Sequence, residues 1–217
     1  MHLSNPRSCA AIVGVILVLM GAVAPAAASE ERLEELRSFL AGLTTLEAEF
    51  EQQVLNSDGD VVELASGTVR LKKPGRFRWN YTEPYERVVV ADGERVWIYE
   101  SDLQQVTVRR LTSGLGETPA ALLTGDTAAL DQFEYVTSFV ADGRDWITLR
   151  PKAADADFSA ISLAFRNDVL DALELQDRLG QSTRLSLINV ARDREIGNAE
   201  FEFIVPDDAD VIGETEL

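Results

Sequence analysis

Residues 71–99 read LKKPGRFRWNYTEPYERVVVADGERVWIY and hold three short strand patterns separated by turn residues. Phe77, Trp79 and Tyr81 alternate with polar residues, a period of two that is typical of a strand with one buried face. Asp92-Gly93 separates the apolar runs 86–91 and 95–100, and an Asp-Gly pair tolerates the positive φ of a tight hairpin. The stretch therefore predicts consecutive antiparallel strands.

The same alternation continues along most of the chain. Turn signals of the hairpin type recur at Asn56-Ser57-Asp58-Gly59, Asp142-Gly143 and Asn167-Asp168. Between them, alternating segments predict further strands near 46–51, 61–72, 104–111, 133–140, 145–150, 158–166, 169–177, 182–190 and 199–205. We therefore expect a mainly β fold of about 11 strands, in an antiparallel sheet that must curl or close.

Two segments predict helices beside this sheet. Four leucines spaced three or four residues apart indicate an amphipathic helix capped by Ser29: Leu33, Leu36, Leu40 and Leu43. Residues 118–123 combine a capping threonine, a proline at the first helical position and helix formers, which predicts a short helix across the open face of the sheet. No linker divides residues 29–217, so we expect a single domain.

Residues 1–28 resemble a cleaved secretory signal. Arg7 precedes an apolar run from Ala10 to Val23, and Ala26-Ala27-Ala28 before Ser29 is a small-residue cleavage site. The apolar run is too short to span a bilayer, which takes about 20 residues. The only cysteine and the only histidine, Cys9 and His2, lie in this segment. The expected mature chain therefore has no thiol, no imidazole base and no metal site with sulfur or imidazole ligands.

The composition restricts the possible partners further. The formal net charge is −17, so the surface repels nucleic acid and anionic headgroups. Several aspartates lie close together at 155–157 and 207–210, but the spacing of a calcium loop is absent, so we expect neither metal nor cofactor. A secreted hydrolase with paired carboxylates is an alternative of another class, although no pattern places two carboxylates in one cleft.

The 71–99 block resembles a pattern of the periplasmic outer-membrane lipoprotein carrier family, or LolA-like proteins. The resemblance covers Leu71 to Tyr81, Glu83-Pro84, the run Val88 to Gly93 and Val96-Trp97-Ile98-Tyr99. Thr118-Pro119 with Leu122-Leu123 resembles the lid helix of that family, and Phe201-Glu202-Phe203 resembles its last strand.

The resemblance implies an incomplete antiparallel β-barrel covered by a helical lid. Such proteins are not enzymes; they are monomeric carriers that take lipoprotein acyl chains from an inner-membrane ABC-type release complex to an outer-membrane receptor. The implied acyl-chain cavity is lined by Phe50, Val69, Leu71, Phe77, Trp79, Trp97, Leu122 and Leu123. The best-studied branch has a latch arginine before the proline; here Lys73 occupies that position and implies a weaker latch. Four cations on the same stretch suggest a docking rim for an acidic partner: Arg70, Lys72, Arg76 and Arg78.

Acyl chains require a carrier for a physical reason. Each buried CH₂ is worth about 0.8 kcal/mol, so exposing a 16-carbon chain to water costs on the order of 10 kcal/mol. An apolar hollow kept free for guests, with a cover that opens, would meet this need without catalysis. Two related functions remain open: an outer-membrane receptor of the same fold, which should carry a lipid-modified cysteine, and a periplasmic lipoprotein sensor, which usually has a second domain.

Overall fold

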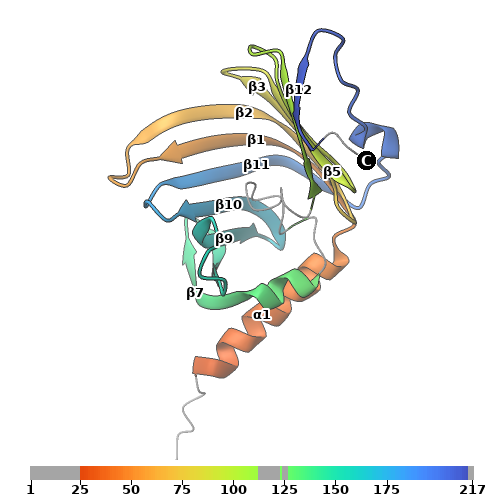
Figure 1. Ribbon diagram of the computed structural model, residues 1–217. Coiled ribbons are helices and arrows are strands. Elements are labelled where there is room, and N and C mark those ends of the chain that lie inside the picture. Colours follow the sequence, from red (N-terminus) through yellow and green to blue (C-terminus); the bar gives the residue numbers. More distant parts are fainter. Residues whose placement is uncertain (1–24, 112–122, 124–126, 215–217) are drawn as a thin grey trace, which may run out of the picture.

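The computed structural model describes residues 25–111, 123 and 127–214 (Figure 1). The first half contains α1 (Pro25–Gly42), β1 (Thr45–Leu55), β2 (Val61–Lys72), β3 (Arg76–Glu83), β4 (Arg87–Asp92), β5 (Arg95–Glu100) and β6 (Gln105–Arg110). The second half contains η2 (Thr127–Gln132), β7 (Phe133–Ala141), β8 (Arg144–Pro151), β9 (Phe158–Arg166), β10 (Val169–Asp177), β11 (Ser182–Arg192), η3 (Asn198–Phe201) and β12 (Asp210–Gly213).

The described strands form a 12-stranded sheet in the order β12-β6-β5-β4-β3-β2-β1-β11-β10-β9-β8-β7. Neighbouring strands are antiparallel except β12, which runs parallel to β6. The sheet curves strongly, and α1 with η2 lies across its opening (Figure 1). The predicted incomplete antiparallel barrel with a covering helix is therefore confirmed.

The turn chemistry follows the sequence closely. Gly59, Gly93 and Gly143 all have positive φ, as does Asn167 in the β9–β10 hairpin. Asp92 holds its own turn, because its Oδ1 accepts hydrogen bonds from the amides of Glu94 and Arg95, each at 2.8 Å. These turns fix the register of the hairpins.

Gly67 allows two parts of the sheet to approach closely. It lies opposite Phe50 on one side and Tyr81 on the other, next to a register shift between β2 and β3. A Cβ atom at this position would lie 1.9 Å from the carbonyl oxygen of Asn80. The curvature here therefore requires glycine.

Two details of the prediction were wrong. Helix α1 begins at Pro25, so Ser29 lies inside the helix rather than at its cap. The alanines at 26–28 are strong helix formers, which explains the longer helix. The segment 199–205 is not a strand: η3 occupies its first part, and the last strand is β12. Phe201 and Phe203 alternate because they pack on the outer face of the sheet, not because they pair in a ladder.

Candidate functional site

The concave face of the sheet carries one large apolar cluster. Alternation along β1, β2 and β3 directs five of the predicted cavity residues to this face: Phe50, Val69, Leu71, Phe77 and Trp79. Leu123 belongs to the same cluster. The leucine stripe of α1 covers the cluster, with Leu36, Leu40 and Leu43 each 1% exposed. Leu122, with most of the predicted lid at 118–123, lies outside the described residues. The helix and the strands thus share a single apolar interior.

The six residues of this cluster that are expected to line the cavity are all buried. Leu71 and Phe77 are 0% exposed, and Trp79, the most exposed of the six, is only 3% exposed. Their contact with acyl chains stays a prediction.

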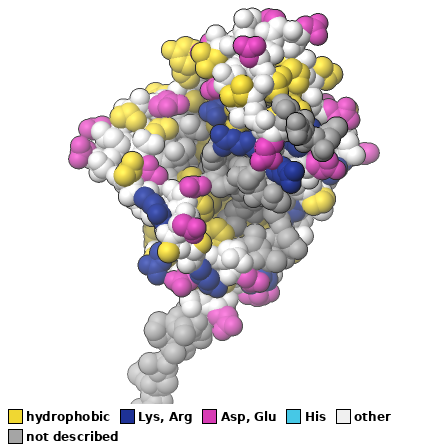
Figure 2. Space-filling model, viewed as in Figure 1, with side chains coloured by type: hydrophobic (Ala, Val, Ile, Leu, Met, Phe, Trp, Pro, Cys, Tyr) yellow, Lys and Arg dark blue, Asp and Glu magenta, His cyan; other side chains and the backbone are white. Residues whose placement is uncertain are grey.

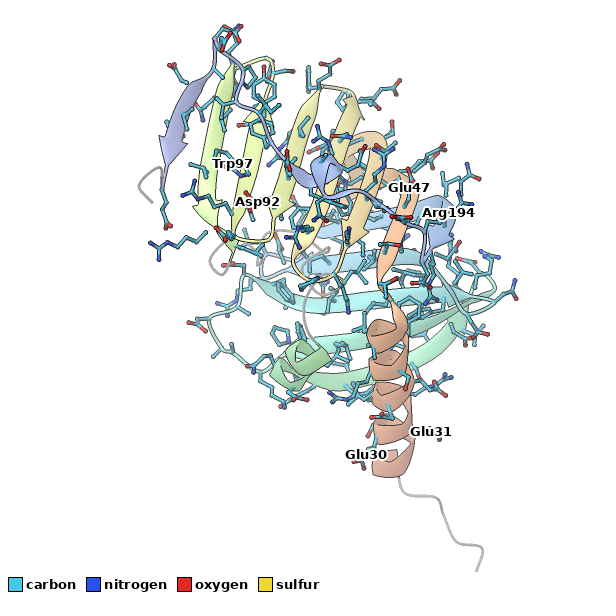
Figure 3. The ribbon with its side chains drawn as sticks, turned by 90° about the vertical axis from the view of Figure 1, so that its right-hand side faces the viewer. Glu30, Glu31, Glu47, Asp92, Trp97 and Arg194 are labelled. Carbon is cyan, nitrogen blue, oxygen red and sulfur yellow. The ribbon has the colours of Figure 1, made fainter. Side chains whose placement is uncertain are left out.

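Trp97 was predicted to line the cavity, but it lies on the other face of the sheet. Val96 enters the concave cluster, so Trp97, its neighbour on β5, points to the opposite face. There its ring stacks on Phe203 at 5.8 Å, and its Nε1 donates to Asp92 Oδ2 at 2.9 Å. Figure 3 shows Trp97 and Asp92 close together on the face that the C-terminal segment crosses. Trp97 therefore anchors that segment from outside the barrel.

The bond to Trp97 also affects the titration of Asp92. Partial burial raises the pKa of this carboxyl group, but the hydrogen bonds from Trp97 and from the amides of Arg95 and Glu94 outweigh burial. The net effect is a lowered pKa. Asp92 is therefore a charged, preorganised acceptor at the outer face.

Lys73 joins the sheet to the covering helix. Its Nζ donates to the carbonyl oxygen of Leu40 in the last turn of α1, at 2.7 Å. A cation is favourable at this end of a helix, because the last carbonyls point outward with their negative dipole. The predicted latch residue thus contacts α1; its role in opening stays a prediction.

The junction of α1 and β1 is held by a second set of contacts. Asp193 Oδ1 accepts from the hydroxyl of Thr44 at 2.8 Å and from its amide at 3.1 Å. The hydroxyl bond, and then the amide bond, lower the pKa of Asp193. Thr45 adds a bond from its Oγ1 to the carbonyl oxygen of Arg194 at 2.7 Å. Sequence patterns gave no signal for this junction, because its partners lie about 150 residues apart.

All four predicted docking cations contact their own chain, and three of them contact the segment at 196–202. Lys72 Nζ donates to the carbonyl oxygen of Ile196 at 2.7 Å and to Asn198 at 2.8 Å. Arg70 pairs with Glu47 at 2.8 Å and reaches Glu200 at 3.5 Å, and Arg78 contacts the carbonyl oxygen of Glu202 at 3.4 Å. Arg76 contacts the carbonyl oxygen of Pro74 at 3.5 Å. The basic stretch therefore holds the segment that contains η3 against the sheet.

An open cleft of about 450 Å³ lies between α1 and the ends of β8, β9 and β11. Its apolar walls include Leu36, Phe39, Ile147 and Phe165, and its charged residues are Arg32, Glu35, Asp145, Asp168 and Arg192. The rings of Phe39 and Phe165 meet edge to face at 4.8 Å, and the Arg192 guanidinium lies 4.7 Å from the Phe39 ring. Sequence reasoning missed this cleft, because its residues come from distant segments.

A second opening of about 380 Å³ lies where β3 meets β4. Tyr81 and Ala65 form part of its wall, and carboxylates such as Glu63, Glu83 and Glu100 surround it. Burial raises the pKa of Tyr81, whose hydroxyl donates to Gln52 Oε1 at 3.1 Å. Figure 2 shows apolar, acidic and basic side chains interspersed on one face of the molecule. Both openings thus have charged residues among their walls.

Within the described ranges, no helix is both long enough and apolar enough to cross a membrane. The same residues hold no group of three or more histidine, cysteine, aspartate or glutamate side chains suited to a metal ion.

The fold and the site define a class of protein: a curved, incomplete β-barrel whose apolar concave face is covered by a helix. The family model described as outer membrane lipoprotein carrier protein LolA matches residues 41–204. This chain belongs to that family.

Individual relatives agree over most of the chain. An outer-membrane lipoprotein carrier protein of Methylobacillus flagellatus is 36% identical over 202 residues, which cover 93% of this chain and 98% of that protein. One of Alkalilimnicola ehrlichii is 41% identical over 178 residues, covering 82% of each. Among solved structures, an uncharacterized conserved protein of Thermus thermophilus has a TM-score of 0.53 at 14% identity, covering 85% of this chain and 98% of that one, and shares the fold.

Proposed function

We propose that this chain is a periplasmic carrier that binds the acyl chains of lipoproteins and delivers them to the outer membrane, without a catalytic step. One observation carries the proposal: relatives named outer-membrane lipoprotein carrier proteins match nearly the whole chain. The apolar concave face under α1 supports it, because acyl chains buried there leave water and gain about 0.8 kcal/mol per CH₂.

The packing of the α1 leucine stripe on the apolar face suggests how binding stays reversible. An entering acyl chain replaces the leucine stripe of α1, so apolar contacts are exchanged for apolar contacts. The net affinity is then smaller than the gross gain from burial, and the return of α1 helps to expel the cargo. The cleft beside Phe39 and Phe165 already separates part of α1 from the sheet, and we propose that opening starts there. Lys73 would act as the latch that resists it.

The cargo exchange needs a donor and an acceptor. We propose that an inner-membrane ABC-type complex supplies the lipoprotein and that an outer-membrane receptor accepts it. Docking at the basic stretch would compete with the segment at 196–202, since Arg70, Lys72 and Arg78 hold that segment. Arg76→Glu should therefore slow uptake from the release complex without unfolding the protein. Arg150→Glu, which makes the same charge change on β8, is the matched control.

We also propose that residues 1–28 are a cleaved signal. Cleavage before Ser29 would remove the first turn of α1 and leave the buried leucine stripe intact. Amino-terminal sequencing of the exported protein should begin at Ser29. A start elsewhere would contradict this part of the proposal.

The function is tested with membranes that retain newly made lipoprotein. After incubation with the purified protein and the release complex, we expect a soluble one-to-one complex of protein and lipoprotein. A lipoprotein whose acylated cysteine is replaced by serine is the cargo control and should not be captured. Absence of the complex with acylated cargo, or equal capture of the unacylated form, would refute the carrier function.

A further inference from the structure

Among the described residues, the indole N–H of Trp79 has no hydrogen-bond acceptor, although the residue is only 3% exposed. Leaving a buried donor unsatisfied costs about 1–3 kcal/mol, so such groups are uncommon in native proteins and call for an explanation. Trp97 provides the contrast, since its N–H is satisfied by Asp92 at 2.9 Å. The orphaned donor at Trp79 is therefore a particular feature of the interior.

Nothing about packing requires an N–H group at this position. Trp79 lies opposite Val69 on β2 and Val89 on β4, and its ring meets Phe50 at a centroid distance of 5.2 Å. These neighbours are apolar, so a wholly apolar side chain would pack against them without the cost of an unpaired donor. The polar atom is explained if a bound ligand supplies the acceptor.

The position of Trp79 suggests which part of a ligand it meets. Along β3, Phe77, Trp79 and Tyr81 point to the same face, and Tyr81 lines the opening between β3 and β4. Trp79 is two residues deeper than Tyr81, about 7 Å along the strand. Beyond it lie Phe77 and Leu71, both 0% exposed, in the fully apolar part of the interior.

We infer that the Trp79 indole N–H donates a hydrogen bond to a carbonyl oxygen of the cargo, at the ester or amide group that begins an acyl chain. This inference rests on the proposed carrier function. A hydrocarbon tail alone has no acceptor, whereas each acyl linkage carries one carbonyl at its polar end. The bond fixes the depth of insertion: the carbonyl stays at Trp79 near the opening, and the tail extends past Phe77.

The test compares two probes that differ only in the acceptor: methyl palmitate and an alkane of equal length, each added to the protein in detergent micelles. The ester should bind the wild type more tightly than the alkane. Trp79→Phe keeps an aromatic ring but removes the donor, and should lower ester affinity about two- to tenfold with alkane affinity unchanged. Trp97→Phe removes an N–H outside the barrel and is the matched control, with both affinities unchanged.

A second readout does not depend on affinity. In ¹⁵N-labelled protein, the Trp79 indole proton should shift downfield on addition of ester but not of alkane, whereas the Trp97 indole proton should not respond.

The outcomes separate this inference from the carrier function. If both probes bind but Trp79→Phe weakens them equally, or not at all, the carbonyl bond is refuted and the carrier function stands. An indole proton that shifts equally with both probes points to a buried water as the acceptor and also overturns the inference. If neither probe binds and lipoprotein is not captured, the carrier function itself has failed.

Discussion

Replacing Lys73 by methionine should loosen the covering helix. Methionine keeps most of the length of the side chain but cannot donate to the Leu40 carbonyl, which Nζ now contacts at 2.7 Å. Hydrogen bonds that involve a charged group are worth about 1.5–3 kcal/mol. Because this hydrogen bond is only partly buried, we take the lower limit of its contribution, about 1.5 kcal/mol. Losing that free energy makes the population of molecules with α1 opened roughly tenfold larger.

Amide hydrogen exchange measures this opening directly. Exchange in the second half of α1 should become about tenfold faster in Lys73→Met, whereas β1 at the centre of the sheet should keep its wild-type rates. Lys73→Arg should restore most of the protection, since a guanidinium also donates to a carbonyl. Transfer of lipoprotein into the protein should be faster in Lys73→Met, and premature loss of cargo to detergent should also be faster.

A matched lysine controls for the general loss of a charge. Lys152 Nζ makes a bond of the same length, 2.7 Å, to the carbonyl oxygen of Asp131 in η2. Lys152→Met should leave exchange in the second half of α1 unchanged. Wild-type exchange in Lys73→Met, or the same acceleration in both variants, would refute the latch.

Three further predictions concern the scaffold. In urea denaturation, Gly67→Ala should lower the free energy of unfolding by about 3 kcal/mol or more, because the added Cβ would lie 1.9 Å from the Asn80 carbonyl oxygen. Gly42→Ala is the control and should change the free energy of unfolding little, because no atom lies within 4 Å of the added Cβ. Because the folded-state pKa of Asp92 is lowered, its charge stabilises the fold above the unfolded pKa of about 3.9, and this contribution is lost as pH falls through the folded value. The difference in melting temperature between wild type and Asp92→Asn should therefore shrink from about pH 6 to about pH 3, and a constant difference would contradict the assignment. Phe201→Ala, which removes a ring that is 1% exposed, should destabilise the protein by about 3–5 kcal/mol in thermal unfolding; a loss below about 1 kcal/mol would show that η3 is not firmly packed.

The errors of sequence interpretation have a common physical cause. An alternating pattern shows that residues share a face, but it does not show which face turns inward, because this depends on the turns and on pairing with neighbouring strands. Trp97 illustrates this point: the hairpin at Asp92 puts Val96 inside the barrel and Trp97 outside. Phe201 and Phe203 alternate like a strand, yet they pack side chains onto an existing sheet without joining its ladder.

Local chemistry alone determined the turns, most of the strands and the leucine stripe of α1, because hairpin geometry and periodicity act over a few residues. The motifs of the 71–99 block likewise identified the family. Only the tertiary structure decided that α1 covers the apolar face, that Lys73 reaches α1 and that the basic stretch binds residues 196–202. It alone also decided that the Trp79 N–H lacks a partner among the described residues. Each of these depends on groups brought together from distant parts of the chain, and no short-range pattern encodes such distances.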